Sequence, residues 1–131
     1  MHIRYLNTDL DVMGASDLAP LAAALQAQGV LALHVTRGAD GQWRATFETP
    51  SQYDEPADTI AALNSAIEAM PAPAAADWRA CTLRELNIGY DCGRSPHAFN
   101  QALPNPLLRR MAASGVALRI TLYPEDEEKA P

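Results

Sequence analysis

The densest collection of side chains that could do chemistry lies between residues 91 and 100. It combines a carboxylate, a thiol, a guanidinium, a hydroxyl, an imidazole and an amide, contributed by Asp91, Cys92, Arg94, Ser95, His97 and Asn100. A thiol enzyme needs a cysteine beside a histidine base, but it also needs an orienting third group and an oxyanion hole. No family-type signature surrounds Cys92, so we assign no catalytic residue.

The same stretch is better suited to binding than to catalysis. It follows a predicted strand and mixes charged, amide and aromatic groups, which is typical of surfaces that dock a partner. We therefore predict a binding loop formed by Asp91, Arg94, His97, Phe99 and Asn100. The simpler alternative is a strand end followed by a connecting loop, with Gly89 and Gly93 allowing the backbone to bend or pack closely.

Candidate metal ligands elsewhere are sparse. Asp9 and Asp11 would share one side of an extended segment and could serve a hard cation. No third acidic ligand follows at a suitable spacing, and such residues are common turn formers. Cys81 and Cys92 lack a second Cys or His pair and are expected to be reduced thiols. His34 lies in an apolar run and is expected to be structural or exposed, so we expect no metal and no cofactor.

Composition and charge exclude several classes of protein. The chain has 131 residues, 48% hydrophobic and 20% charged, which fits one globular domain. Its net charge is −6, and its basic residues are scattered, which argues against nucleic-acid binding and is compatible with a basic protein partner. The longest apolar run, about eight residues, is too short to span a membrane, and the start lacks the layout of a secretory signal. We therefore expect a cytoplasmic protein.

The first half of the chain predicts strands and helices of contrasting periodicity. A strand is expected over residues 3–6, ending in a polar turn at 7–11. A helix follows, capped by Ser16 or Asp17 and ended by Gly29. Strands over 30–36 and 42–49 flank a hairpin turn at 38–41. The alternation of Trp43, Ala45 and Phe47 with polar residues predicts a strand that is buried on one face.

The second half predicts two further helix–strand pairs. One helix opens at Pro56 and carries Ile60, Leu63, Ile67 and Met70 on one face. Residues 71–76 read as a semi-rigid connector rich in Ala and Pro, with a short helix around Asp77 and Trp78 as an option. A strand over 82–91, a loop over 93–104, a helix from Asn105 to Gly115 and a strand over 116–123 complete the order.

This order, βαββαβ followed by αβ, predicts an α+β fold. The first six elements match a ferredoxin-like core, and right-handed crossovers place its helices on one face. We expect a five-stranded, mixed but mainly antiparallel sheet, with the last strand parallel to its predecessor. Residues 1–124 are expected to form a single domain, and residues 125–131 an acidic disordered tail.

The last third of the chain resembles small bacterial domains of unknown function. The similarity rests on Thr82–Asp91, which ends in Ile-Gly-Tyr-Asp, on Pro106–Met111, and on Ala117–Pro124, which ends in Leu-Tyr-Pro. In those domains a strand of this pattern precedes a short helix and a final strand. The resemblance implies a bacterial domain and assigns no catalytic residue.

Three hypotheses about function follow. The first is a non-enzymatic protein-binding domain, for example an immunity or inhibitor protein that blocks a basic toxin, because a small acidic chain can steer association with a basic target. The second is a small-molecule-binding or enzymatic domain that uses the loop from Asp91 to Asn100. The third is a homodimer formed through the open sheet face or an edge strand.

Overall fold

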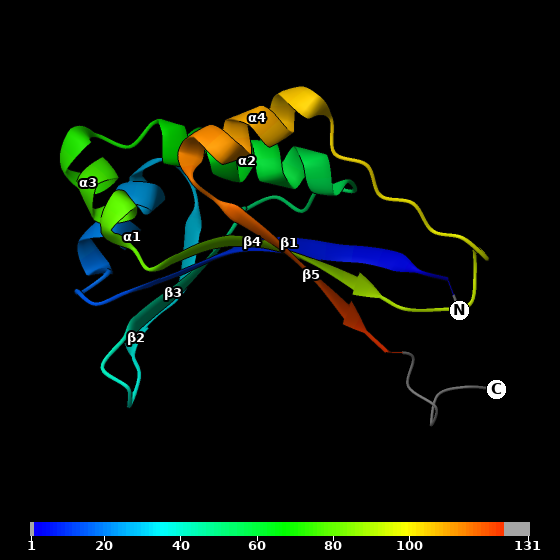
Figure 1. Ribbon diagram of the computed structural model, residues 1–131, viewed down its shortest axis with the longest axis horizontal. Coiled ribbons are helices and arrows are strands. Elements are labelled where there is room, and N and C mark those ends of the chain that lie inside the picture. Colours follow the sequence, from blue (N-terminus) through cyan, green and yellow to red (C-terminus); the bar gives the residue numbers. More distant parts are fainter. Residues whose placement is uncertain (1, 125–131) are drawn as a thin grey trace.

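A computed structural model describes residues 2–124, and over this range the chain forms one layer of helices packed on one twisted sheet (Figure 1). The predicted acidic tail, residues 125–131, lies outside the described residues. The elements run in the order β1 (Arg4–Gly14), α1 (Ala19–Ala27), β2 (Leu31–Arg37), β3 (Trp43–Glu48), α2 (Pro56–Glu68), α3 (Ala72–Ala80), β4 (Leu83–Asp91), α4 (Asn105–Ser114) and β5 (Ala117–Tyr123). Among these residues, no helix has both the length and the apolar character needed to cross a bilayer.

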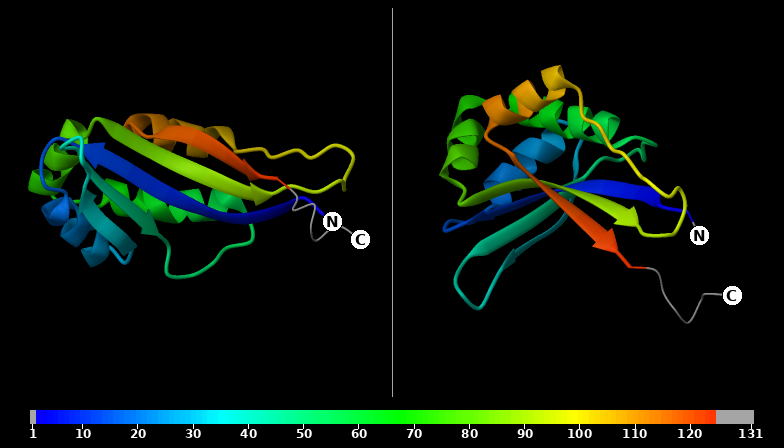
Figure 2. Two further views of the ribbon diagram at one scale, coloured as in Figure 1. Left: turned by 90° about the horizontal axis from the view of Figure 1, so that it is seen from below. Right: turned by 45° about the vertical axis from the view of Figure 1, so that its right-hand side comes forward.

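The strand order confirms the predicted topology. The sheet has the order β2-β3-β1-β4-β5. The pairs β2–β3, β3–β1 and β1–β4 are antiparallel, which is the ferredoxin-like arrangement, and β5 is added parallel to β4 through the crossover helix α4. Seen from below, the sheet lies in front and all four described helices lie behind it (Figure 2).

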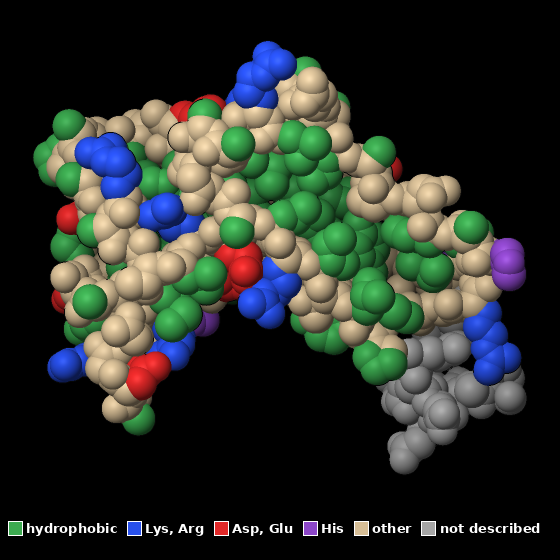
Figure 3. All heavy atoms as spheres, in the orientation of Figure 1, with side chains coloured by type: hydrophobic (Ala, Val, Ile, Leu, Met, Phe, Trp, Pro, Cys, Tyr) green, Lys and Arg blue, Asp and Glu red, His purple; other side chains and the backbone are tan. Residues whose placement is uncertain are grey.

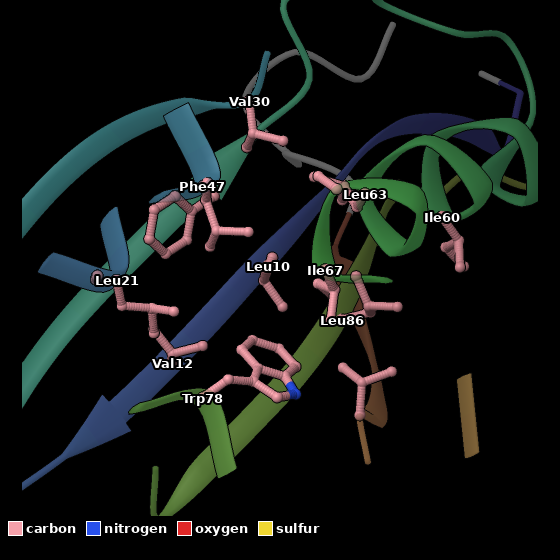
Figure 4. Close-up of a cluster of buried hydrophobic side chains, with 14 of the residues drawn as sticks. Leu10, Val12, Leu21, Val30, Phe47, Ile60, Leu63, Ile67, Trp78 and Leu86 are labelled. Carbon is pink, nitrogen blue, oxygen red and sulfur yellow. The ribbon is translucent and has the colours of Figure 1, made fainter. Parts of the chain in front are cut away.

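The hydrophobic core lies between the helices and one face of the sheet. Alternate residues of the three central strands point toward the helices and are buried, among them Leu10 and Val12, Phe47, and Leu86. Figure 4 shows how they meet side chains from the helices, including Leu21 of α1, Ile60, Leu63 and Ile67 of α2, and Trp78 of α3. Burying each side chain of this size contributes roughly 1.5–3 kcal/mol, so this contact determines which sheet face the helices cover.

Two predicted boundaries were wrong, both because tertiary packing overrides local preference. The turn predicted at residues 7–11 is part of β1, which runs to Gly14. Asp9 and Asp11 are poor strand formers, but they alternate with buried Leu10 and Val12 in a strand that is paired on both sides. The sheet pairing and the buried row therefore keep this segment extended.

The predicted Ala/Pro connector is also helical, because α3 begins at Ala72. Pro71 precedes the helix and Pro73 falls in its first turn, where a missing N–H costs nothing. The alanines that follow are strong helix formers. Trp78 anchors the helix, since its ring is buried and its Nε1 donates to the carbonyl of Ser114 at 2.8 Å.

One arginine joins the ends of α3 and α4 to β4. Arg84 Nη1 donates to the carbonyls of Trp78 and Arg79 at 3.1 Å and of Cys81 at 3.2 Å. Its Nε donates to the carbonyl of Gly115 at 2.9 Å. A cation that satisfies the free carbonyls at a helix C-terminus also interacts favourably with the helix dipole. Arg84 therefore fixes the point from which β5 starts.

Gly115 ends α4 in a left-handed conformation that favours glycine. Its φ is +71°, its N–H donates to Ala112, and the N–H of Val116 donates to Met111, both at 3.1 Å. These are the two bonds of a Schellman motif. A Cβ at this position would also come within 3.3 Å of the Arg84 guanidinium.

We expect Gly115→Ala to lower the free energy of unfolding by about 1 kcal/mol, because the added Cβ is strained at positive φ. Gly14→Ala is the matched control, since its Cβ would make an ordinary 3.5 Å contact with Leu18, and it should change stability by less than about 1 kcal/mol in either direction. Urea unfolding followed by circular dichroism measures both. Equal losses in the two variants would contradict the assignment.

Candidate functional site

The loop predicted to bind is held to the rest of the domain at several points. Asp91 ends β4 and forms an ion pair with Arg4 across the β1–β4 ladder, at 2.8 Å. Farther along, the N–H of Ile3 donates to the carbonyl of Ser95 at 2.7 Å. The carboxylate of Asp91 thus already has a structural partner, Arg4 on the neighbouring strand β1.

Phe99 fastens the later part of the loop to the sheet. Its ring meets the edge of Tyr90 with centroids 5.2 Å apart, and the buried Tyr90 hydroxyl donates to Gln101 at 2.9 Å. Arg94, His97 and Asn100 are exposed. Of the five predicted binding residues, Asp91 and Phe99 therefore have identified contacts with the sheet.

The groove beside Asp91 does not combine the residues that a thiol enzyme would use. It has a volume of about 300 Å³ and is lined by His2, Ile3, Arg4 and Asp91. Cys92 leaves the sheet here, with its N–H donating to the carbonyl of Tyr123 at 2.9 Å. Neither Cys92 nor His97 lines this groove, so it offers no position between a thiol and an imidazole.

Sequence reasoning missed a larger polar groove beside the first half of β1. Because β3 pairs with β1 only from Leu10 onward, the segment after β3 curls away and leaves a groove of about 430 Å³, lined in part by residues 5–8 and 48–53. At its base the Tyr5 hydroxyl lies 2.7 Å from that of Thr8 and 2.9 Å from that of Thr59. These hydroxyls satisfy one another, as buried polar groups must, so we assign them a structural role.

The uncovered face of the sheet is polar and internally hydrogen-bonded. Thr46 donates to Asp11 at 2.8 Å, Arg119 pairs with Glu85 at 2.5 Å, and Thr121 donates to Asn87 at 2.7 Å. The strands of this face border a hollow of about 330 Å³. Asp9 and Asp11 share this face, as their spacing predicts, but residues 2–124 contain no group of three or more His, Cys, Asp or Glu side chains placed to hold a metal ion.

Asp9 stands out electrostatically on this face. Burial, together with the nearby carboxylates of Asp11 and Glu48, raises its pKa to about 6. The polar contact that the structure gives this carboxylate is a hydrogen bond from Asn7 Nδ2 at 3.1 Å. Asp9 is therefore a carboxylate in a locally negative environment, and its ionisation opposes folding.

The most distinctive surface is apolar and lies at the opposite edge of the sheet from β2. Leu118, Ile120 and Leu122 of β5 are 41%, 56% and 61% exposed, respectively. They are in register with the buried Leu86, Ile88 and Tyr90, so they point to the helix side, but no described helix covers them. Leu108 of α4 and Phe99 are also exposed, and green side chains gather between α4, β5 and the loop (Figure 3). We call these five residues the C-terminal apolar strip.

The sequence contained part of the signal for this strip. Alternation in residues 116–123 predicts that Leu118, Ile120 and Leu122 share one face of a strand. Alternation cannot show whether a helix covers that face. Phe99 is the one residue of the strip that also belongs to the predicted binding loop.

Comparison with known proteins does not assign this surface. The chain matches no family model, no curated protein and no solved structure.

Asp9→Asn should raise stability above pH 6 by up to about 1 kcal/mol, a value reduced from the full pKa shift because the carboxylate is half exposed. The folded-state pKa of about 6 exceeds the ordinary aspartate value of 3.8, so between these pH values the native protein binds more protons than the unfolded chain. The contribution of Asp9 to the free energy of unfolding of the wild-type protein thus falls as the pH rises from about 4 to 6. The variant should lose that dependence in urea unfolding measured at several pH values.

Asp54→Asn serves as the control, because it removes the same charge from an exposed position. If both variants follow the wild-type pH profile, or if both depart from it equally, the local negative environment of Asp9 is not the cause.

Proposed function

We propose that this chain is a protein-binding domain that docks its partner through the C-terminal apolar strip and the outer edge of β5. One observation carries the proposal: five large apolar side chains, each 40–61% exposed, gather at a single edge of the sheet. Scattered exposed leucines are normal on a protein surface, but a contiguous apolar patch marks an interaction site.

The backbone of β5 adds a second kind of complementarity. β5 is the last strand of the sheet, and its outer edge presents N–H and C=O groups that no strand of residues 2–124 pairs. Such an edge is a template for an added strand, with main-chain bonds supplying affinity and alternate side chains supplying specificity. Seven consecutive residue pairs join β5 to β4 without a register shift, so the edge is regular.

The other edge of the sheet is less suited to this role. The β2–β3 ladder shifts register between Ala32 and His34, which leaves Leu33 outside the pairing. Irregularities of this kind twist an edge away from further strands. Leu33 is 50% exposed, but it stands apart from the strip. This contrast favours β5 as the docking edge.

A more specific form of the proposal is a bacterial immunity or inhibitor protein that blocks a basic toxin. The net charge of −6 supports it, because charge complementarity accelerates association with an oppositely charged partner. The rival hypothesis, a small-molecule-binding or enzymatic domain using the loop from Asp91 to Asn100, has less support. The groove beside Asp91 does not include Cys92 or His97, and Phe99 extends the apolar strip.

Ile120→Glu is expected to reduce capture of the partner at least 10-fold, because it places a charge in the middle of the apolar strip. Tagged wild-type chain and variant would be compared by pull-down from bacterial lysate with quantitative mass spectrometry, including the product of the adjacent gene. Leu33→Glu is the matched control, since it makes the same change at a similarly exposed position on the other edge.

Capture that is equal in all three proteins would count against the strip as the docking surface. Loss with Leu33→Glu alone would move the site to the β2 edge. Circular dichroism of each variant establishes that a loss of binding is not a loss of folding.

A further inference from the structure

We infer that the occupant of the β5 edge is a second copy of this chain, paired antiparallel about a twofold axis through Ile120. The inference rests on the proposed function and names a second copy, in place of a toxin, as the partner of that same surface. It starts from the sequence of the strand, Leu118-Arg119-Ile120-Thr121-Leu122. This segment is symmetric about Ile120 in its pattern of apolar and polar residues.

Symmetry of this kind is what a twofold strand pairing requires. In an isologous interface, residue i of one copy meets residue j of the other, and j meets i. With Ile120 on the axis, Ile120 lies opposite itself, Leu118 lies opposite Leu122 of the second copy, and Arg119 lies opposite Thr121. Every directly opposed pair is then apolar with apolar or charged with polar, which is the favourable pairing in a sheet.

The charges of β5 are compatible with this arrangement. Arg119 is the one cation of the strand, and it already pairs with Glu85 of its own chain at 2.5 Å on the uncovered sheet face. Antiparallel pairing also places the Tyr123 residues of the two copies at opposite ends of the paired strands.

The apolar area suits a dimer of ordinary size. Five side chains that are each about half exposed offer on the order of 400 Å² per copy, and a standard interface buries about 800 Å² per partner. The backbone edge of β5 and the flanks of α4 and the 92–104 loop would add to this area. Figures 1 and 2 show no described helix lying over β5. The strips of two copies can therefore meet above the joined strands.

Sedimentation equilibrium of the purified chain tests the inference. The expected mass is twice 14.1 kDa. Ile120→Glu should raise the dissociation constant at least ~100-fold, because the twofold axis places two carboxylates against each other. Leu33→Glu should leave the mass unchanged. A monomer at about 0.1 mM protein, or a dimer that Ile120→Glu does not weaken, would overturn the inference.

Cysteine cross-linking tests the register. Ile120→Cys should form an intermolecular disulfide with itself under mild oxidation, because directly opposed strand residues lie within bridging distance. Leu118→Cys should link only when it is mixed with Leu122→Cys. The wild-type chain reports any linkage through Cys81 and Cys92. Self-linkage of Leu118→Cys that matches that of Ile120→Cys would contradict the proposed axis.

The two proposals fail in different ways. If the wild-type chain is monomeric but loses a captured protein on Ile120→Glu, the strip is a docking surface for a different partner and only the second copy is excluded. If neither self-association nor capture responds to Ile120→Glu, the docking function of the strip is excluded as well.

Discussion

The helices of this protein cover one face of its sheet but do not extend over the last strand, β5. The exposed apolar surface of the protein depends on this incomplete cover. The core forms where the buried faces of α1, α2, α3 and α4 meet the alternate residues of β1, β3 and β4. Beyond β4 the same alternation continues into β5, but the covering layer does not. An apolar row that a wider layer of helices would bury is therefore left at the surface, beside a strand edge that no other strand of residues 2–124 pairs.

The helices leave β5 uncovered because of the way in which the chain connects β4 to β5. A right-handed crossover returns α4 to the helix side, where it packs against α2 through Arg110, which pairs with Glu68 at 2.8 Å. Arg84 and the left-handed Gly115 then turn the chain sharply into β5. With α4 drawn toward α2, Leu108 of α4 is left exposed.

Periodicity in the sequence was enough to predict the order of the main elements and the side on which their apolar residues lie. The prediction failed at β1, because aspartates such as Asp9 and Asp11 are typical of turns and the sequence does not show that this segment is paired with a strand on both sides. It failed at α3, where prolines resemble a linker until Trp78 is seen to be buried. The candidate site was harder still, because exposure of β5 depends on where α4 packs, which is a tertiary property. The side chains of residues 91–100 attract attention by their chemistry, yet part of that loop is occupied in holding the N-terminal strand.

The register shift in β2 limits how many copies could assemble. A chain with two regular sheet edges can add strands indefinitely and polymerise into a fibre. Here the edge at β2 is interrupted at Leu33, and a twofold joint at β5 would consume the regular edge of each copy. Such an assembly closes after two subunits, so the apolar row that invites association would also be hidden by it.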